Sequence, residues 1–222
     1  MKRILEPELM EDEAQALAYA RADFSDSNRK FVSYFTELVG REFAGTVLDL
    51  GCGPGDIPLR LVQICPRLVV HALDGSGAML QLAREAAASV PEVAARVKWI
   101  QGMVREAALP CVSYDAVVSN SLLHHLPDPA ALWDTLGRVA HPGAPVAVMD
   151  LFRPASAEIA QAIVDKYATG EAEILRRDFL ASLHASFELS EIQQQLADAK
   201  LEGLDVQIVS DRHVLVAGRL KG

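Results

Sequence analysis

A glycine-rich turn with an acidic residue at its entrance is the segment whose composition best suggests chemistry. Residues 47–56 read VLDLGCGPGD, an apolar run followed by three glycines at alternate positions. Glycines in such a turn let backbone N–H groups approach a ligand without interference from a Cβ atom. The spacing is not GxGxxG and no Walker lysine follows, so dinucleotides and triphosphates are disfavoured as ligands.

Two aspartates indicate what this ligand carries. Asp49 stands at the entrance of the turn, where a negative charge repels a pyrophosphate and attracts an ammonium group. Asp74 ends the next apolar run, and a carboxylate at that position can accept hydrogen bonds from both hydroxyls of a ribose. The predicted ligand therefore has a ribose, a cationic amino-acid end and no phosphate.

A series of apolar runs must position these residues. The runs cover 46–50, 68–73, 97–100, 116–119 and 144–151, and helical patterns lie near 57–65, 76–89 and 128–140. Runs that are apolar on both faces and alternate with helices are typical of a parallel sheet covered on both sides. Two closing runs, 205–209 and 214–217, are separated by a short gap that predicts an antiparallel hairpin.

In these segments the chain resembles the class I S-adenosylmethionine-dependent methyltransferases. The resemblance covers roughly residues 45–152 and implies S-adenosylmethionine as the cofactor. The flanking helices look like those of a bacterial subgroup that methylates small molecules, and this resemblance does not identify a substrate. The residues that carry the resemblance are, in the family's order, 49–55 (DLGCGPG), 74–80 (DGSGAML), 115–126 (DAVVSNSLLHHL) and 142–148 (PGAPVAV).

The resemblance also implies which residues contact the cofactor. After the third strand the family often has Gly-Asp, whereas this chain has Gly102-Met103, so adenine contacts are expected from backbone groups of Met103 and Val104. The other expected contacts are Asp49 near the amino group, Gly51, Cys52 and Gly53 along the methionine portion, Asp74 at the ribose, Gly75 and Met79 beside the ribose and adenine, and Asn120 near the sulfonium.

Candidate catalytic and acceptor-binding residues follow the fourth and fifth strands. Removal of a proton from an oxygen or nitrogen acceptor suits a histidine, and His124 and His125 lie where open α/β sheets bind ligands. We expect His124 to act as the base, with Tyr19, His125 and Arg153 contacting the acceptor. The alternatives are a histidine pair that merely begins a loop, a core position for Tyr19 and a surface ion pair for Arg153. Adjacent histidines with no ligand spacing around them predict no metal site.

The organisation expected for residues 1–222 is a single α/β domain. Its sheet is doubly wound and Rossmann-like, mostly parallel with an antiparallel C-terminal hairpin strand, with helices on both faces and an N-terminal helical cap. The expected parts are the cap at 8–40, the cofactor-binding core at 45–152, a helical insertion at 154–200 and the closing hairpin at 203–219.

Composition narrows the partners and the setting. The net charge is −9 and Lys and Arg occur at most in adjacent pairs, so we expect a small-molecule acceptor and no nucleic acid. No run reaches the ~18–20 apolar residues of a membrane helix, so no membrane association is expected. Three cysteines without CxxC spacing favour a reducing, cytoplasmic setting. The oligomeric state is not specified by these patterns.

The function expected from these features is methyl transfer by in-line displacement at the sulfonium methyl. The acceptor pocket would be capped by the N-terminal helices and the 154–200 insertion. The alternative is a non-catalytic sensor or docking module that binds S-adenosylmethionine without turnover. An NAD-dependent oxidoreductase is disfavoured by the glycine spacing, and a serine hydrolase by the missing first glycine before Ser76.

Overall fold

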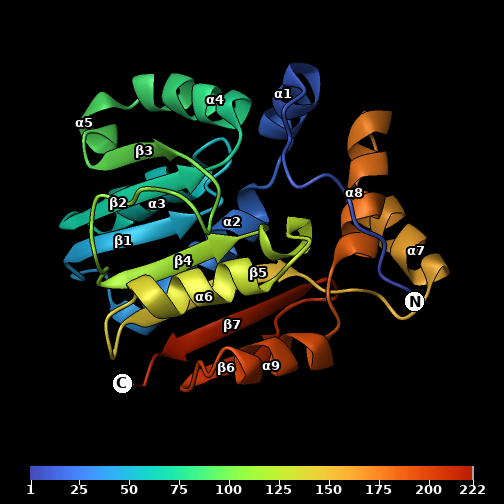
Figure 1. The fold of residues 1–222 in the computed structure, drawn as a ribbon. Coiled ribbons are helices and arrows are strands. Elements are labelled where there is room, and N and C mark those ends of the chain that lie inside the picture. Colours follow the sequence, from blue (N-terminus) through green and yellow to red (C-terminus); the bar gives the residue numbers. More distant parts are fainter. Residues whose placement is uncertain (222) are drawn as a thin grey trace.

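Seven strands form one mixed sheet in the computed structural model, which describes residues 1–221 (Figure 1). The strand order is β3-β2-β1-β4-β5-β7-β6; the first five are parallel, and β7 runs antiparallel to both β5 and β6. The predicted fold class is thereby confirmed. The strands are β1 (Gly45–Leu50), β2 (Leu68–Asp74), β3 (Val97–Gln101), β4 (Ala116–Asn120), β5 (Pro145–Leu151), β6 (Leu204–Ile208) and β7 (His213–Arg219).

The strand order reverses between β1 and β4. The chain moves from β1 outward through β2 to β3, then returns to pair β4 with the other side of β1. At such a point the loops after neighbouring strands separate in opposite directions and leave a crevice at the carboxyl ends, where open α/β sheets bind ligands. The crevice of this chain therefore lies beyond β1 and β4.

Helices cover both faces of the sheet because its strands are apolar on both sides. Val47 packs in one apolar cluster with Phe31 and Phe35 of α2, whereas Leu48, the next residue, packs in a second cluster with Trp133 of α6. The helices are α1 (Glu13–Arg21), α2 (Ser25–Val39), α3 (Asp56–Ile64), α4 (Gly77–Ala88), α5 (Pro91–Ala94), the 3-10 turn η1 (Leu123–His125), α6 (Ala130–Val139), α7 (Ala157–Tyr167), α8 (Glu173–Ala185) and α9 (Leu189–Asp198).

The helical segments expected at 8–40 and 154–200 each divide into two parts. Helix α2 packs against the sheet, while α1 lies beyond the carboxyl ends of the strands (Figure 1). Helices α7 and α8 share an apolar cluster of their own, built on Ile163, Val164 and Leu183, whereas Ile192 and Leu196 of α9 join the core beside α6. Of these helices, α1 and the first turn of α2 contribute residues to the cavity at the crevice end of the sheet, and α7 and α8 contribute none.

The N-terminal segment, residues 1–12, runs across the carboxyl end of the sheet and joins helices that are distant in sequence. The Ile4 N–H donates to the His184 carbonyl at the end of α8 (3.0 Å), and the Ser76 hydroxyl at the start of α4 donates to the Met10 carbonyl (2.7 Å). The segment has no helix or strand of its own before Glu13, so these hydrogen bonds and its side chains hold it in place.

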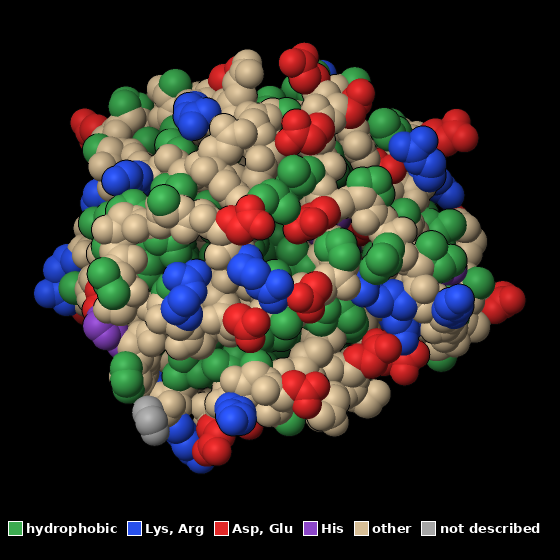
Figure 2. Space-filling model, viewed as in Figure 1, with side chains coloured by type: hydrophobic (Ala, Val, Ile, Leu, Met, Phe, Trp, Pro, Cys, Tyr) green, Lys and Arg blue, Asp and Glu red, His purple; other side chains and the backbone are tan. Residues whose placement is uncertain are grey.

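The surface mixes the two signs of charge. Figure 2 shows Lys and Arg side chains interspersed with Asp and Glu over the face that it presents. Within residues 1–221, no helix is both long and apolar enough to cross a lipid bilayer.

Candidate functional site

A cavity of about 280 Å³ lies at the carboxyl ends of β1, β2 and β4. The turns after these strands form its floor, while Glu8, Leu9 and Met10 of the N-terminal segment and Tyr19 of α1 contribute to its walls. Every predicted cofactor-binding residue except Asp49 lines this cavity. They are Gly51, Cys52, Gly53, Asp74, Gly75, Met79, Met103, Val104 and Asn120.

The glycine turn uses its own N–H groups to fasten β1 to β2. The N–H groups of Gly51 and Cys52 both donate to the Leu73 carbonyl (2.8 and 2.9 Å), and the Gly53 N–H donates to an Asp74 carboxylate oxygen (2.8 Å). Donors that are already bonded do not form a nest for phosphate. The turn therefore agrees with the expectation of a phosphate-free ligand.

Replacing Gly51 by alanine is expected to destabilise the protein more than the same change at Gly143. Both glycines have positive φ, +75° and +81°, which costs an L-residue about 1–2 kcal/mol. A Cβ at Gly51 would also lie 2.8 Å from the Leu122 side chain, whereas a Cβ at Gly143 would have no atom within 4 Å. Such overpacking adds about 1–3 kcal/mol. Thermal unfolding followed by circular dichroism measures both variants, and equal losses would contradict this account.

Asp74 is held by two backbone donors and keeps lone pairs for a ligand. Its Oδ1 accepts from the Ser76 N–H and its Oδ2 from the Gly53 N–H, both at 2.8 Å. A carboxylate has about four acceptor positions, so two remain for ligand hydroxyls. Burial raises the pKa of Asp74, while the two backbone hydrogen bonds oppose that rise.

Asp49 is a buried carboxylate without a partner. It is 1% exposed, lies behind the cavity wall, and neither of its oxygens has a hydrogen-bond partner among residues 1–221. Burial, and then the charge of Asp74, raise the pKa of Asp49 to about 8. An unpaired buried carboxylate is costly unless a cation or donor reaches it. The position thus suits a ligand with a positive end.

Cys52 is part of the wall and not a nucleophile. Burial, together with the carboxylates of Asp49 and Asp74, raises the pKa of the Cys52 thiol well above its ordinary range. Only a thiolate attacks or ligates efficiently. A protonated, small side chain instead leaves room for a ligand beside the turn.

Four residues of the cavity wall form a hydrogen-bonded network that the sequence does not predict. The Asn120 amide donates to the Asn28 side-chain oxygen (3.3 Å), and the Asn28 amide donates to Asp56 (2.8 Å). Asp56 also accepts from Arg60 Nε at 2.5 Å. Asn28 lies in the first turn of α2, and Asp56 and Arg60 lie in the first turn and middle of α3. Their positions give no sign that they face a common cavity.

Tyr19 reaches the cavity from α1, as expected. Its ring lies 4.8 Å from that of Phe24, and both residues line the cavity. Burial raises the pKa of Tyr19 to about 12, with nearby carboxylates adding to the effect. The phenol is therefore neutral near pH 7 and can donate or accept a hydrogen bond.

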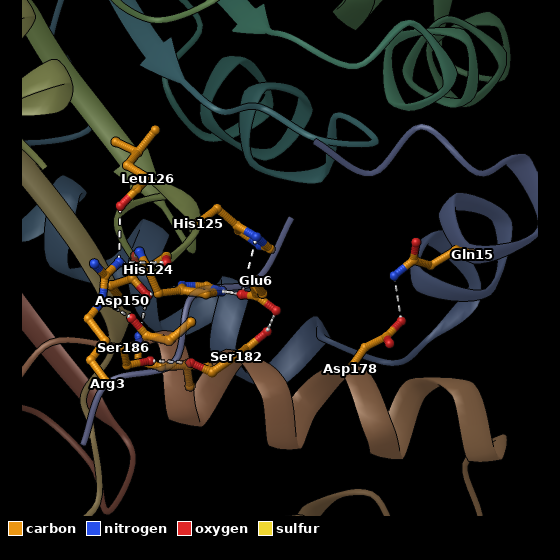
Figure 3. A network of polar contacts seen from close by, with 12 residues as sticks. Arg3, Glu6, Gln15, His124, His125, Leu126, Asp150, Asp178, Ser182 and Ser186 are labelled. Carbon is orange, nitrogen blue, oxygen red and sulfur yellow. Dashed lines mark hydrogen bonds and ion pairs between the residues drawn. The ribbon is translucent and has the colours of Figure 1, made fainter. Parts of the chain in front are cut away.

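His124 and His125 occupy different sides of the wall. His125 lines the cavity, whereas His124 is 3% exposed and lies behind it. His124 Nδ1 bonds to Asp150, and its Nε2 faces Glu6 Oε1 at 3.5 Å (Figure 3). The expectation of His124 as a base at the acceptor is corrected accordingly, because both of its ring nitrogens point to carboxylates.

The two rings titrate in opposite directions. Burial opposes charge on His124, but Asp150 and Glu6 outweigh it and raise the pKa of His124. Burial, and then the neighbouring His124, lower the pKa of His125 to about 3. His125 is consequently a neutral ring at the cavity wall, stacked 4.2 Å from His124.

Arg153 does not reach the cavity. Its guanidinium forms ion pairs with Glu188 (2.9 Å) and Glu191 (3.1 Å) and donates to the Ser186 carbonyl (3.2 Å). Those two glutamates form the capping box of α9. The expected acceptor contact is therefore corrected to an ion-pair network that joins β5 to the start of α9.

Negative charge predominates among the ionisable groups of the cavity wall. Arg60 is the single Lys or Arg that lines it, and this guanidinium is already paired with Asp56. The carboxylates that line it are Glu8, Asp23, Asp56 and Asp74.

Part of the chain is similar in sequence to known methyltransferases. Residues 47–143 match the model of a family described as "Methyltransferase domain". An uncharacterized methyltransferase of Mycobacterium tuberculosis is 35% identical over 108 residues, 49% of this chain and 51% of the relative. A trans-aconitate 2-methyltransferase of Azoarcus sp. is 34% identical over 125 residues, 56% of this chain and 46% of the relative. The chain thus spans about half the length of these curated relatives.

Solved structures share the architecture over nearly the whole chain. A SAM-dependent methyltransferase from Aquifex aeolicus superposes with a TM-score of 0.68 at 20% identity, covering 94% of this chain and 98% of the other. A putative S-adenosyl-L-methionine-dependent methyltransferase from Methanococcus maripaludis gives 0.72 at 17% identity, covering 99% and 98%. At these identities the likeness establishes the fold.

Proposed function

We propose that the protein transfers a methyl group from S-adenosylmethionine to a small-molecule acceptor, because residues 47–143 match a methyltransferase family model and the chain shares its fold with S-adenosylmethionine-dependent methyltransferases. The observation that carries this proposal is the pair of carboxylates at the glycine turn, the buried Asp49 and the half-buried Asp74. Asp74 has acceptor positions left for two hydroxyls, and Asp49 has no partner for its charge. A ribose and an ammonium group supply what each of them lacks.

Different residues around the turn would contact different parts of the cofactor. Gly51, Cys52 and Gly53 would line the methionine portion, with Asp49 behind them balancing the amino group. Further along the cavity, Gly75 and Met79 would flank the ribose and adenine beside Asp74, and the backbone of Met103 and Val104 would meet the adenine. When bound, the cofactor supplies an electrophilic methyl group, so the chain's task is to orient the acceptor and exclude water.

The acceptor would lie between Asn120 and α1. Asn120 ends β4 and lines the cavity, as do Tyr19 of α1, Phe24 and His125. The neutral His125 ring can accept a hydrogen bond from an acceptor hydroxyl or amine. The phenol of Tyr19 can orient the same group.

The charge of the cavity favours a neutral or cationic acceptor. A trianionic acceptor would face several wall carboxylates and a single arginine already neutralised by Asp56. Like charges enclosed together disfavour binding by several kcal/mol. The chain is therefore proposed to act on a different class of acceptor from trans-aconitate, although enzymes for that acid are among its relatives.

Labelling by charge class tests this proposal. Purified protein is incubated with methyl-labelled S-adenosylmethionine and with cell extract separated into anionic, neutral and cationic small-molecule fractions. We expect label in products of the neutral or cationic fractions and none in added trans-aconitate. Label confined to polycarboxylates would overturn the acceptor class. Tight cofactor binding without label in any fraction would instead favour a binding module that does not turn over.

A further inference from the structure

Glu6, His124 and His125 bring three potential metal ligands together where the N-terminal segment meets η1. Their ligand atoms all lie within 4.8 Å of one another. Figure 3 shows the Glu6 carboxylate directed at both rings from the N-terminal segment. Glu6 Oε1 is 3.2 Å from His125 Nδ1 and 3.5 Å from His124 Nε2. The sequence alone does not indicate this group of three ligands, because Glu6 is far from the two histidines along the chain.

The Ser182 hydroxyl donates to Glu6 Oε2 (3.3 Å), but the contacts of Glu6 Oε1 with the two rings are not hydrogen bonds. The Glu6 side chain is 9% exposed, yet Oε1 has no hydrogen-bond partner within residues 1–221, and neither has His125 Nδ1. Charge-assisted N–H···O bonds are shorter, about 2.7–2.9 Å, than either contact. A buried carboxylate oxygen and a neutral imidazole nitrogen are thus directed at one point without satisfying each other.

The two separations that involve Glu6 match those around a small divalent cation, while the two histidine nitrogens lie within 4.8 Å of each other. With metal–ligand bonds of about 2.0–2.1 Å, as for zinc, tetrahedral geometry separates neighbouring ligand atoms by about 3.3 Å. The two separations from Glu6 Oε1, 3.2 and 3.5 Å, lie on either side of that value. Two histidines and one glutamate are also a donor set found in zinc enzymes, where water takes the fourth position.

A second carboxylate orients one of the ligands. Asp150 bonds to His124 Nδ1 and also accepts from the His124 backbone N–H (3.2 Å), which leaves Nε2 directed toward Glu6. Metal-bound histidines almost always give their other ring nitrogen such a carboxylate or carbonyl partner. Asp150 is therefore a positioning residue for this set.

From this geometry we propose that Glu6, His124 and His125 bind one divalent transition-metal ion of the zinc type. Glu6 Oε1 and His125 Nδ1 are both buried, so the ion would be enclosed, although the His125 side chain also borders the cavity. The ion would fasten residues 1–10 to η1. Leu9 and Met10 of that segment line the cavity, so a bound ion would hold the cavity closed.

Metal titration of the full chain tests the site without any cofactor or acceptor, so its result is independent of the proposed methyl transfer. Chelator-treated protein is titrated with Zn²⁺ by calorimetry, and with Co²⁺ by visible absorption, which reports tetrahedral coordination. We expect one equivalent of each ion to bind and the midpoint of thermal unfolding to rise with Zn²⁺ concentration. Absence of stoichiometric binding would overturn the proposal.

Matched variants locate the site. Glu6→Gln and His125→Ala are expected to weaken Zn²⁺ binding on the order of 100-fold or more, and Asp150→Asn by about 10–100-fold. Glu8→Gln, in the same segment, and His141→Ala, distant from the cluster, should bind as the unaltered protein does. Circular dichroism confirms that each variant folds. Equal affinity in the Glu6→Gln and unaltered proteins would assign binding to another place and contradict the proposal.

Discussion

Replacing Asp74 by alanine is expected to weaken the binding of S-adenosylmethionine by at least about 100-fold. The carboxylate is proposed to accept two ribose hydroxyls, and hydrogen bonds to charged groups contribute about 1.5–3 kcal/mol each. Since about 1.4 kcal/mol corresponds to a factor of ten, losing both predicts this effect or a larger one. The substitution also frees the Gly53 and Ser76 N–H groups, which loosens the turn itself.

Two further variants separate ligand binding from folding. Asp74→Asn keeps the shape and one acceptor oxygen, so it should retain the fold and show an intermediate affinity. Asp23→Asn removes a carboxylate from the cavity mouth, at a distance from the ribose position, and should bind within a few-fold of the unaltered protein. Calorimetric titration at one pH measures all three. An unchanged affinity in Asp74→Ala would remove the basis for the cofactor's placement.

The residues proposed to meet the cofactor are those that local patterns in the sequence could reveal. Each of them follows an apolar strand, and parallel strands bring their carboxyl ends to one edge of the sheet. The position of Asp74 after β2 and of Asn120 after β4 could therefore be predicted without coordinates.

The acceptor side depends on contacts that no local pattern carries. Residues 1–7 precede every predicted element, and residues 8–12, expected in the helical cap, form no helix, so the sequence does not indicate that Glu6 reaches His125 or that Leu9 lies against Gly75. The roles expected for His124 and Arg153 were inferred from their positions after strands. Both side chains instead meet carboxylates from elsewhere in the chain, Asp150 and the start of α9. The position of a residue after a strand predicts that its Cα atom lies at the edge of the sheet. The direction of its side chain depends on partners that are distant in the sequence.

The buried Asp49 carboxylate lowers the stability of the ligand-free protein and is proposed to bind the ammonium group of the cofactor. Its ordinary pKa is near 3.8 and burial raises it to about 8 in the folded chain. The folded state therefore holds the proton more tightly than the unfolded state. The stability due to this group is fully present below about pH 4 and is lost as the pH rises toward 8. Each pKa unit corresponds to about 1.4 kcal/mol, so ionising Asp49 without a partner costs several kcal/mol.

Replacing Asp49 by asparagine should consequently shift stability and cofactor affinity in opposite directions. An amide of the same shape avoids the buried charge, so the ligand-free variant is expected to unfold at a higher temperature than the unaltered protein at pH 8. The gain should be smaller at pH 5 and close to zero at pH 4. Its affinity for S-adenosylmethionine should fall, because the ammonium group loses its counter-charge. The matched Asp56→Asn variant removes a wall carboxylate that already has partners and should show no such stabilisation at pH 8.

The pH dependence of binding distinguishes this role of Asp49 from a merely steric one. If the cofactor pairs with ionised Asp49, binding requires loss of its proton, and affinity should rise by roughly tenfold per pH unit between pH 6 and 7 before levelling near pH 8. The cofactor's own α-amino group loses its charge near pH 8, which limits the rise above that point. Asp49→Asn should flatten the profile below pH 8. An unaltered slope in the variant would show that another group takes up the proton, and Asp49 would then have no electrostatic part in holding the cofactor.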